Sequence, residues 1–506
     1  MPHGFLRSAH VKLSVSAVTA AALVFTATPN VQASPAPLAP SPVASQSGVP
    51  AGAPEPLVAF SIHPSGTVQQ LIPQFLALKA MGATAIRTDF QWTQIQPGGF
   101  GTAENWTQND ADVQAAEATG LKVDAVLDYS NPLYSTAGAA NGGSQDYPPD
   151  NPETFARFAA EVARHYQGRI ARYEVWNEEN LGFRFWLPQA DPAAYGTLLC
   201  DTYRQLKRVS PRVPVMSGGV FKEPVGDFTG FLIGGSDFLD QMLTSIGNQR
   251  CFDAVAYHPY PYPHISPEAT VPGPGSTSAA AYPAKLRAVL DKHHVSRSIP
   301  LWDTEIGWPT NPTDNGVTEE IQAEYTIRTN LLAWADGVPL ITWYDEYDAS
   351  DAAANTNQEE HFGFFHSDGT PKPVVGAMET YNQVLGGGGW RFTADVSSKL
   401  GLPEGNQGVD EGFALEFTGP YGQHALALWY ANENVPPGCS TGLTVIDCPV
   451  MPTMPAPAAI PVTIPLPANA RLTTMTGTTT TLATPQIQVG QAPVYLTWQG
   501  APLSAP

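Results

Sequence analysis

Between Leu57 and Val384, short apolar runs suited to β-strands alternate with longer runs that have helical periodicity. Residues 68–78, for example, place apolar side chains on one face of a helix that Gly82 would end. The alternation occurs eight times over roughly 330 residues, which predicts an α/β fold of the (β/α)8 barrel type. The predicted strands are Leu57–Ile62, Ala83–Arg87, Leu121–Leu127, Arg172–Trp176, Val213–Ser217, Phe252–Tyr257, Ile299–Glu305 and Pro339–Tyr344.

An open, doubly wound sheet is the main alternative for this alternation. It would require a glycine-rich phosphate turn after the first strand, and the sequence has none there. After Gly389 the helical periodicity stops, and short apolar runs are separated by Gly, Pro, Asn and Thr. This pattern predicts a barrel over residues 57–388 and a small β-sandwich over residues 389–506.

Two of the predicted barrel strands end in a carboxylate. Arg172–Trp176 runs into Asn177 and Glu178, and the apolar run from Ile299 reaches Glu305 just before Gly307. Parallel barrels place their chemistry at the carboxyl ends of the strands, so we expect Glu178 and Glu305 to face each other there. Two facing carboxylates are the minimal machinery for cleaving a glycosidic bond.

The N-terminus has the pattern of a secretory signal. Arg7 and Lys12 precede the apolar run Leu13–Phe25, and small residues follow near Ala33. This predicts a signal peptide over residues 1–33 and a secreted, extracellular protein. A membrane anchor is the competing interpretation, but the run is short for a membrane span. Residues 34–56 are rich in Pro, Ala and Ser, which predicts a disordered linker.

The net charge of −21 argues against a nucleic acid partner, because phosphates would repel the chain. Four cysteines fit an oxidising compartment. Cys439 and Cys448 are close in a Pro/Gly-rich loop, so we expect them to pair, which leaves Cys200 to pair with Cys251. There is no Cys-x-x-Cys or His-rich metal spacing, and we expect no metal or other cofactor.

The two carboxylate motifs, Trp176-Asn-Glu178 and Thr304-Glu-x-Gly-Trp308, resemble clan A of the glycoside hydrolases. The barrel carries this likeness. The trailing β-domain resembles family 39 and its endoglycosidase-like relatives most, with family 5 as a neighbour. The resemblance implies a retaining O-glycosidase that acts on oligo- or polysaccharides as a monomer, with a carbohydrate substrate and no membrane contact after signal cleavage.

The resemblance also implies a role for individual residues. Glu178 would be the general acid/base and Glu305 the nucleophile. Asn177 would hydrogen-bond the sugar 2-hydroxyl, and a like charge nearby should raise the pKa of Glu178. Arg87 and Tyr260 would hold Glu305 ionised. The residues expected to contact substrate or orient these carboxylates are Arg87, Asn177, His258, Tyr260 and Trp343.

Other polar residues near the strand ends have structural interpretations. Asp89 and Asp128 are expected to hydrogen-bond loops, and Glu174 to form an ion pair inside the barrel. His63 and His258 could each be structural or could line the site. Glu179 departs from the family pattern, in which many members have Pro, and should add a charge near Glu178.

Two other functional classes are compatible with a barrel. One is a non-catalytic carbohydrate-binding or scaffold protein, but such a protein would be free to lose Glu178 or Glu305. The other is a phosphate-dependent isomerase or aldolase, for which the sequence has neither a phosphate loop nor a convincing Schiff-base Lys. The sequence does not identify the sugar, or distinguish endo from exo action.

Overall fold

The computed structural model describes residues 52–222, 232–261, 264–270, 277–312, 316–351, 355–405, 410–432, 458–465 and 470–504. The predicted signal peptide, the first part of the predicted linker, Cys439 and Cys448 lie outside this range. In the described part of the chain, no helix is both long and apolar enough to cross a membrane.

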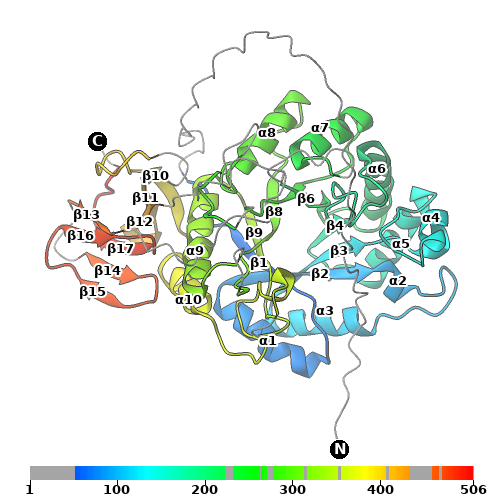
Figure 1. Ribbon diagram of the computed structural model, residues 1–506, viewed down its shortest axis with the longest axis horizontal. Helices are drawn as coiled ribbons and strands as arrows, with labels where there is room; N and C mark the ends of the chain where they lie inside the picture. Colours follow the sequence, from blue (N-terminus) through cyan, green and yellow to red (C-terminus); the bar gives the residue numbers. More distant parts are fainter. Residues whose placement is uncertain are drawn as a thin grey trace, which may run out of the picture. The chain divides into compact units, whose positions relative to one another are not determined.

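The first part of the described chain is a parallel barrel (Figure 1), as predicted. The strands follow the order β5-β4-β3-β2-β1-β9-β8-β7-β6, and Met216 of β5 bridges Ala254 beside β7 to close the sheet. Most strand residues are buried, which explains why these strands read as continuous apolar runs. The strands are β1 (Leu57–Ser61), β2 (Ala83–Gln91), β3 (Lys122–Asp128), β4 (Arg172–Val175), β5 (Val215–Ser217), β6 (Val220–Phe221), β7 (Val255–His258), β8 (Leu301–Ile306) and β9 (Leu340–Trp343).

Helices follow the strands in sequence and surround the sheet, as Figure 1 shows for α5, α6, α7 and α8. The start of α6 illustrates how the sequence sets a boundary: the Asp191 side chain accepts hydrogen bonds from the backbone N–H groups of Ala193 and Ala194, and Pro192 is the first helical residue. The short helices α2 and α4 were not predicted. The helices are α1 (Val68–Ala80), α2 (Trp92–Ile95), α3 (Thr107–Thr119), α4 (Thr136–Ala140), α5 (Pro152–His165), α6 (Pro192–Val209), α7 (Gly235–Ile246), α8 (Tyr282–Lys292), α9 (Glu319–Ala335) and α10 (Pro373–Leu385), with 3-10 turns η1 (Pro132–Tyr134), η2 (Gln358–Glu360) and η3 (Pro420–Gly422).

The fifth barrel strand is divided into β5 and β6 by Gly218 and Gly219. A Cβ atom at Gly218 would lie 2.0 Å from Glu179 Oε2, and one at Gly219 would lie 2.0 Å from His258 Nε2. Only glycine permits these approaches, so the break in the strand gives two buried polar side chains their space.

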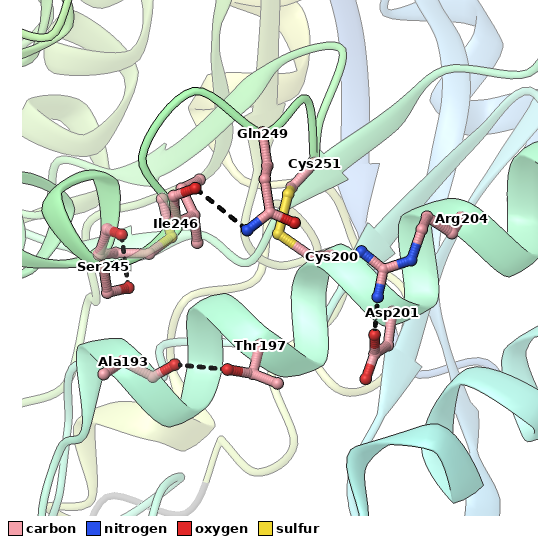
Figure 2. Close-up of a disulfide and its surroundings, with 10 residues drawn as sticks. Ala193, Thr197, Cys200, Asp201, Arg204, Ser245, Ile246, Gln249 and Cys251 are labelled. Carbon is pink, nitrogen blue, oxygen red and sulfur yellow. Dashed lines mark hydrogen bonds and ion pairs between the residues drawn. A yellow bond between two sulfur atoms is a disulfide. The ribbon is translucent and has the colours of Figure 1, made fainter.

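The Cys200–Cys251 disulfide joins α6 to the segment that precedes β7 (Figure 2). It is the pairing expected from the sequence, and it links residues 51 apart in the chain. Both cysteines are buried.

The C-terminal domain contains a six-stranded sheet of order β10-β11-β12-β17-β14-β15 and a separate pair, β13-β16. The central strand β12 (Gln423–Ala431) of the larger sheet is buried on both faces. Along β12, Ala427 and Trp429 pack with the barrel core, while Leu426 and Leu428 pack with residues of β13 and β16. The strands are β10 (Arg391–Asp395), β11 (Glu411–Thr418), β12 (Gln423–Ala431), β13 (Ile460–Thr463), β14 (Arg471–Thr474), β15 (Thr479–Thr481), β16 (Gln486–Val489) and β17 (Val494–Gln499).

Residues 52–56 correct the predicted extent of the disordered linker. The Gly52 N–H donates to Phe392 O at 2.9 Å, and the Phe392 N–H donates to Ala53 O at 3.2 Å. Trp334 Nε1 of α9 also donates to Ala53 O, at 3.0 Å. The composition of this stretch gives it little to bury, but β10 offers it unpaired backbone groups, and these hold it in place.

Candidate active site

The end of β4 turns sharply, and this turn positions Glu178. Trp176 and Glu178 both have positive φ, 75° and 50°, which is uncommon for residues other than glycine. The turn is held by Trp176, whose backbone N–H donates to Leu127 O at 3.0 Å and whose Nε1 donates to Phe185 O at 2.8 Å. A strained backbone that the surroundings fix in this way is typical of functional sites.

Glu305, near the end of β8, accepts hydrogen bonds at both carboxylate oxygens. Arg87 Nη1 of β2 donates to Oε2 at 2.8 Å, and the Tyr260 hydroxyl donates to Oε1 at 2.8 Å. The Glu305 side chain keeps 15% of its surface exposed, whereas that of Arg87 keeps 4%. The carboxylate is therefore held in place at both oxygens and still has an accessible edge.

Arg87 connects Glu305 to β4. Its Nε and Nη2 donate to the two oxygens of Glu174 at 2.8 and 3.1 Å, and Nη2 also donates to Asn177 Oδ1 at 2.8 Å. Nη1 donates to Ser61 Oγ at 2.9 Å as well. Glu174 is thus the barrel ion-pair partner that the sequence predicted, and Asn177 is oriented by the same guanidinium.

Glu178 has the opposite environment to Glu305. It is 5% exposed, and burial raises its pKa to about 8. The Arg184 cation lowers this pKa, while the carboxylates of Glu359 and Glu174 raise it. We had expected a like charge to be the main cause, but desolvation is larger because the side chain is sealed against His258.

The two carboxylates face each other. One oxygen of Glu178, one oxygen of Glu305 and a ring nitrogen of His258 all lie within 4.8 Å of one another. These three residues could in principle ligate a metal ion. Arg87 and Tyr260 already donate to both oxygens of Glu305, so a cation and a hydroxyl hold the place that a metal would take.

Trp343 does not lie where the resemblance put it, and His258 has the structural one of its two expected roles, because both side chains are fully buried. His258 Nδ1 contacts Glu178 Oε1 at 2.8 Å, so its ring lies behind the acid rather than against a ligand. Trp343 packs against Trp308 and Phe364 with ring centroids 6.3 and 5.8 Å away. Neither side chain offers a surface to substrate.

Tyr344, the next residue after Trp343, is half-buried at the open end of the barrel. Its ring packs against Phe362 and His63 with centroids 5.3 and 6.1 Å away. Alternation along the strand sends its side chain to the opposite side from Trp343. Tyr344 was not among the predicted site residues. The alternation of side chains along the strand could have indicated it.

Further residues near the carboxylates were also missed. Tyr129, just after β3, accepts a hydrogen bond from Asn177 Nδ2 at 3.2 Å. Arg184 of the loop after β4 and Glu359 of η2 form an exposed ion pair at 3.5 Å, and the charges of both act on Glu178. His63 is paired with Asp89 at 3.4 Å, which helps raise the pKa of His63 to about 9.

Glu179 does not add a charge near Glu178, contrary to our expectation. It is fully buried, and the side chain of Tyr195 lies beside its carboxyl group. Burial raises the pKa of Glu179 well above its usual range, so the neutral form of the group is favoured.

The comparison with solved structures supports the fold. No family model and no curated protein matches the sequence. The structure is similar to a family 39 glycoside hydrolase from Bacteroides cellulosilyticus, with a TM-score of 0.65, 23% identity, and coverage of 87% of this chain and 81% of the other. It is also similar to a monomeric β-xylosidase from Caulobacter crescentus (TM-score 0.58, 17% identity, coverage 90% and 98%) and to a family 30 endoxylanase from Clostridium papyrosolvens (TM-score 0.52, 13% identity, coverage 89% and 98%). The chain therefore has the fold of clan A glycoside hydrolases, a barrel followed by a β-domain.

Proposed function

We propose that this protein is a retaining glycoside hydrolase, with Glu305 as nucleophile and Glu178 as general acid/base. The observation that carries the proposal is the pairing of two carboxyl groups in opposite environments. Glu305 accepts hydrogen bonds from Arg87 and Tyr260, burial raises the pKa of Glu178 to about 8, and one oxygen of each carboxyl group lies within 4.8 Å of the other. Retaining enzymes need carboxyl groups about 5–5.5 Å apart, whereas inverting enzymes need about 6.5–9.5 Å.

In the first step, an oxygen of Glu305 attacks the anomeric carbon. Glu178 transfers its proton to the glycosidic oxygen as the bond from that oxygen to the anomeric carbon breaks. Tyr260 and Arg87 donate hydrogen bonds to the two oxygens of the attacking carboxylate and orient it. We assign to Asn177 the hydrogen bond to the sugar 2-hydroxyl, and its support is that Arg87 and Tyr129 fix the amide group.

In the second step, the ionised Glu178 takes a proton from a water molecule, which attacks the same carbon. The ester bond to Glu305 breaks, and both carboxyl groups return to their starting states. The burial that raises the pKa of Glu178 to about 8 supports both roles, because the group donates and recovers a proton near neutral pH.

Secretion is part of the proposal. It is supported by the basic residues Arg7 and Lys12, by the apolar run Leu13–Phe25 that follows them, and by the small residues before Ser34. N-terminal sequencing of protein collected from culture medium tests it, with a start near Ser34 as the expected result. An intact Met1 in a membrane fraction would contradict cleavage.

Two alanine variants test the assignment of the carboxylates. Glu305→Ala should abolish turnover, because nothing else can attack the anomeric carbon, and added azide should restore it with a glycosyl azide of inverted configuration. Glu178→Ala should lose about 10²–10⁴-fold on substrates whose leaving group needs a proton. It should still react with a dinitrophenyl glycoside, and azide should then give a product of retained configuration.

The first measurement is the anomeric configuration of the product released by the wild-type protein from a panel of aryl glycosides. Retention is expected. Release of the inverted anomer would rule out the two-step mechanism, and no release from any glycoside would contradict the proposed function. If the two variants exchanged their azide products, the roles of Glu178 and Glu305 would be exchanged too.

A further inference from the structure

A buried chain of hydrogen bonds leads from Glu178 through His258 of β7 and Thr304 of β8 to Glu174 of β4. His258 Nδ1 lies 2.8 Å from Glu178 Oε1, and His258 Nε2 lies 3.1 Å from Thr304 Oγ1. The Thr304 hydroxyl lies 3.2 Å from Glu174 Oε1. Glu178 is 5% exposed and the other three residues at most 1%, so water cannot easily replace any of these partners.

The direction of the chain is set at Glu174. Its Oε1 already accepts from Arg87 Nη2 at 3.1 Å and from the Gly219 N–H at 3.0 Å, and its Oε2 accepts from Arg87 Nε at 2.8 Å. Arginine is always protonated, and a carboxylate paired with it is only an acceptor. The single O–H of Thr304 therefore donates to Glu174.

The direction of the Thr304 hydrogen bond determines which ring nitrogen of His258 carries the proton. Because the Thr304 proton is used on Glu174, the Thr304 oxygen accepts from His258, which places a proton on Nε2. Burial lowers the pKa of His258 to about 4, so the ring is neutral and carries one proton only. Nδ1 is then an acceptor, and the only donor that can face it at 2.8 Å is a protonated Glu178.

We propose that Thr304 is a positioning residue that selects the Nε2–H tautomer of His258, and that this tautomer holds Glu178 in its protonated form. The inference rests on the proposed function. It adds a second cause, besides burial, for the protonated state of Glu178. After Glu178 gives its proton to the leaving oxygen, its carboxylate faces the Nδ1 lone pair. That contact favours recovery of a proton from the attacking water, so the same tautomer assists both steps.

Other charges also act on these two groups. The tests use substitutions at Thr304 because they leave all of these charges in place. Around Glu178 the charged groups are Arg184, Glu359, Arg87 and Glu174, and around His258 they are Glu305, Arg87 and Glu174.

The first test observes the tautomer directly. Histidine is labelled with ¹⁵N in the full protein, and the His258 signals are assigned by their loss in His258→Asn. Long-range ¹H–¹⁵N correlations should place the His258 proton on Nε2 in the wild type. A proton on Nδ1 would overturn the proposal, and this result does not depend on any enzymatic activity.

The second test compares Thr304→Val, which removes the hydroxyl at nearly constant shape, with Thr304→Ser, which retains it. In Thr304→Val the ring can take the Nδ1–H tautomer and donate to an ionised Glu178. When kcat/KM for a phenyl glycoside is measured as a function of pH, its fall on the alkaline side should then occur about one pH unit lower than in the wild type. Thr304→Ser should keep the wild-type pH dependence, and a dinitrophenyl glycoside should show a much smaller change in either variant.

These outcomes separate the inference from the proposed function. If kcat/KM fell at the same alkaline pH in folded Thr304→Val and Thr304→Ser, the role of Thr304 would be overturned. If the wild type hydrolysed no glycoside, the proposed function would fail. The tautomer of His258 would still show whether the hydrogen bonds from Glu178 to Glu174 run in the proposed donor-to-acceptor direction. If Thr304→Val did not fold, the wild-type tautomer would decide alone.

Discussion

Among the residues that the structure describes, two buried arginines bind carboxylates, and one of them belongs to the proposed active site. Arg87 in the barrel pairs with Glu174 and Glu305. Arg328 of α9 donates to both oxygens of Glu268, at 2.9 and 2.6 Å.

The two pairs differ in what else reaches the carboxylate. Glu268 Oε1 accepts a further hydrogen bond from Trp429 Nε1 of the β-domain at 2.9 Å, and its side chain is 4% exposed. Glu305 is 15% exposed and faces Glu178 instead. A buried arginine thus binds a carboxylate in both places, but only Glu305 has an accessible edge beside a second carboxyl group, which is the arrangement that the proposed reaction needs. The second pair connects the barrel to the β-domain.

The largest expected effect comes from Arg87→Met. Loss of its charge-assisted hydrogen bonds to Glu305 should reduce kcat/KM roughly 10- to 150-fold. Glu174 would also remain buried without its cation, so the free energy of unfolding should fall by about 3–5 kcal/mol. Steady-state kinetics and denaturant unfolding measure the two effects. A folded variant with unchanged kcat/KM would make Arg87 a purely structural residue.

Arg328→Met is the matched control for that variant. It should lose a similar stability, about 3–5 kcal/mol, because Glu268 would be left buried and unpaired. Its kcat/KM, measured well below the unfolding temperature, should stay close to the wild-type value. A large loss of kcat/KM in the folded variant would show that the barrel–β-domain connection reaches the active site, and the contrast between the two arginines would fail.

Glu179→Gln sharpens the comparison, because Glu179 is a buried carboxyl with no arginine beside it. Its folded pKa is raised, so the unfolded chain loses this proton first as pH rises above about 4.5, the ordinary value. Wild-type stability should therefore fall with pH by up to about 1.4 kcal/mol per unit relative to Glu179→Gln. Unfolding at pH 5, 6 and 7 measures the difference. Parallel stability curves would mean that Glu179 ionises in the folded protein.

Trp429→Phe should have the smallest effect. It removes one hydrogen bond to Glu268 and retains an aromatic ring beside Phe413, so the expected loss is about 0.5–1.5 kcal/mol with unchanged activity. Thermal and chemical unfolding would detect it. If the free energy of unfolding fell as much as in Arg328→Met, the hydrogen bond from Trp429, and not the ion pair, would contribute most to the contact between the barrel and the β-domain.

Much of this architecture could be predicted from the sequence because it depends on neighbours along the chain. The apolar runs and helical faces set the barrel, and Asp191-Pro192 set the start of α6. Glu178 and Glu305 were found because each ends its own strand, and both carboxylates do lie at the same end of the sheet.

The environment of each group was decided only by the tertiary structure. Glu305 and Arg87 are 218 residues apart, and Glu178 and His258 are 80 apart, so no local pattern records their contacts. Composition could not reveal that Trp343 and Glu179 are fully buried, or that β12 buries both faces. The sequence determined which side chains stand at the strand ends, because strand and helix patterns are local. The pKa of a side chain and its access to substrate depend on solvent exclusion and on charges brought close by folding, and these are set when distant segments pack together.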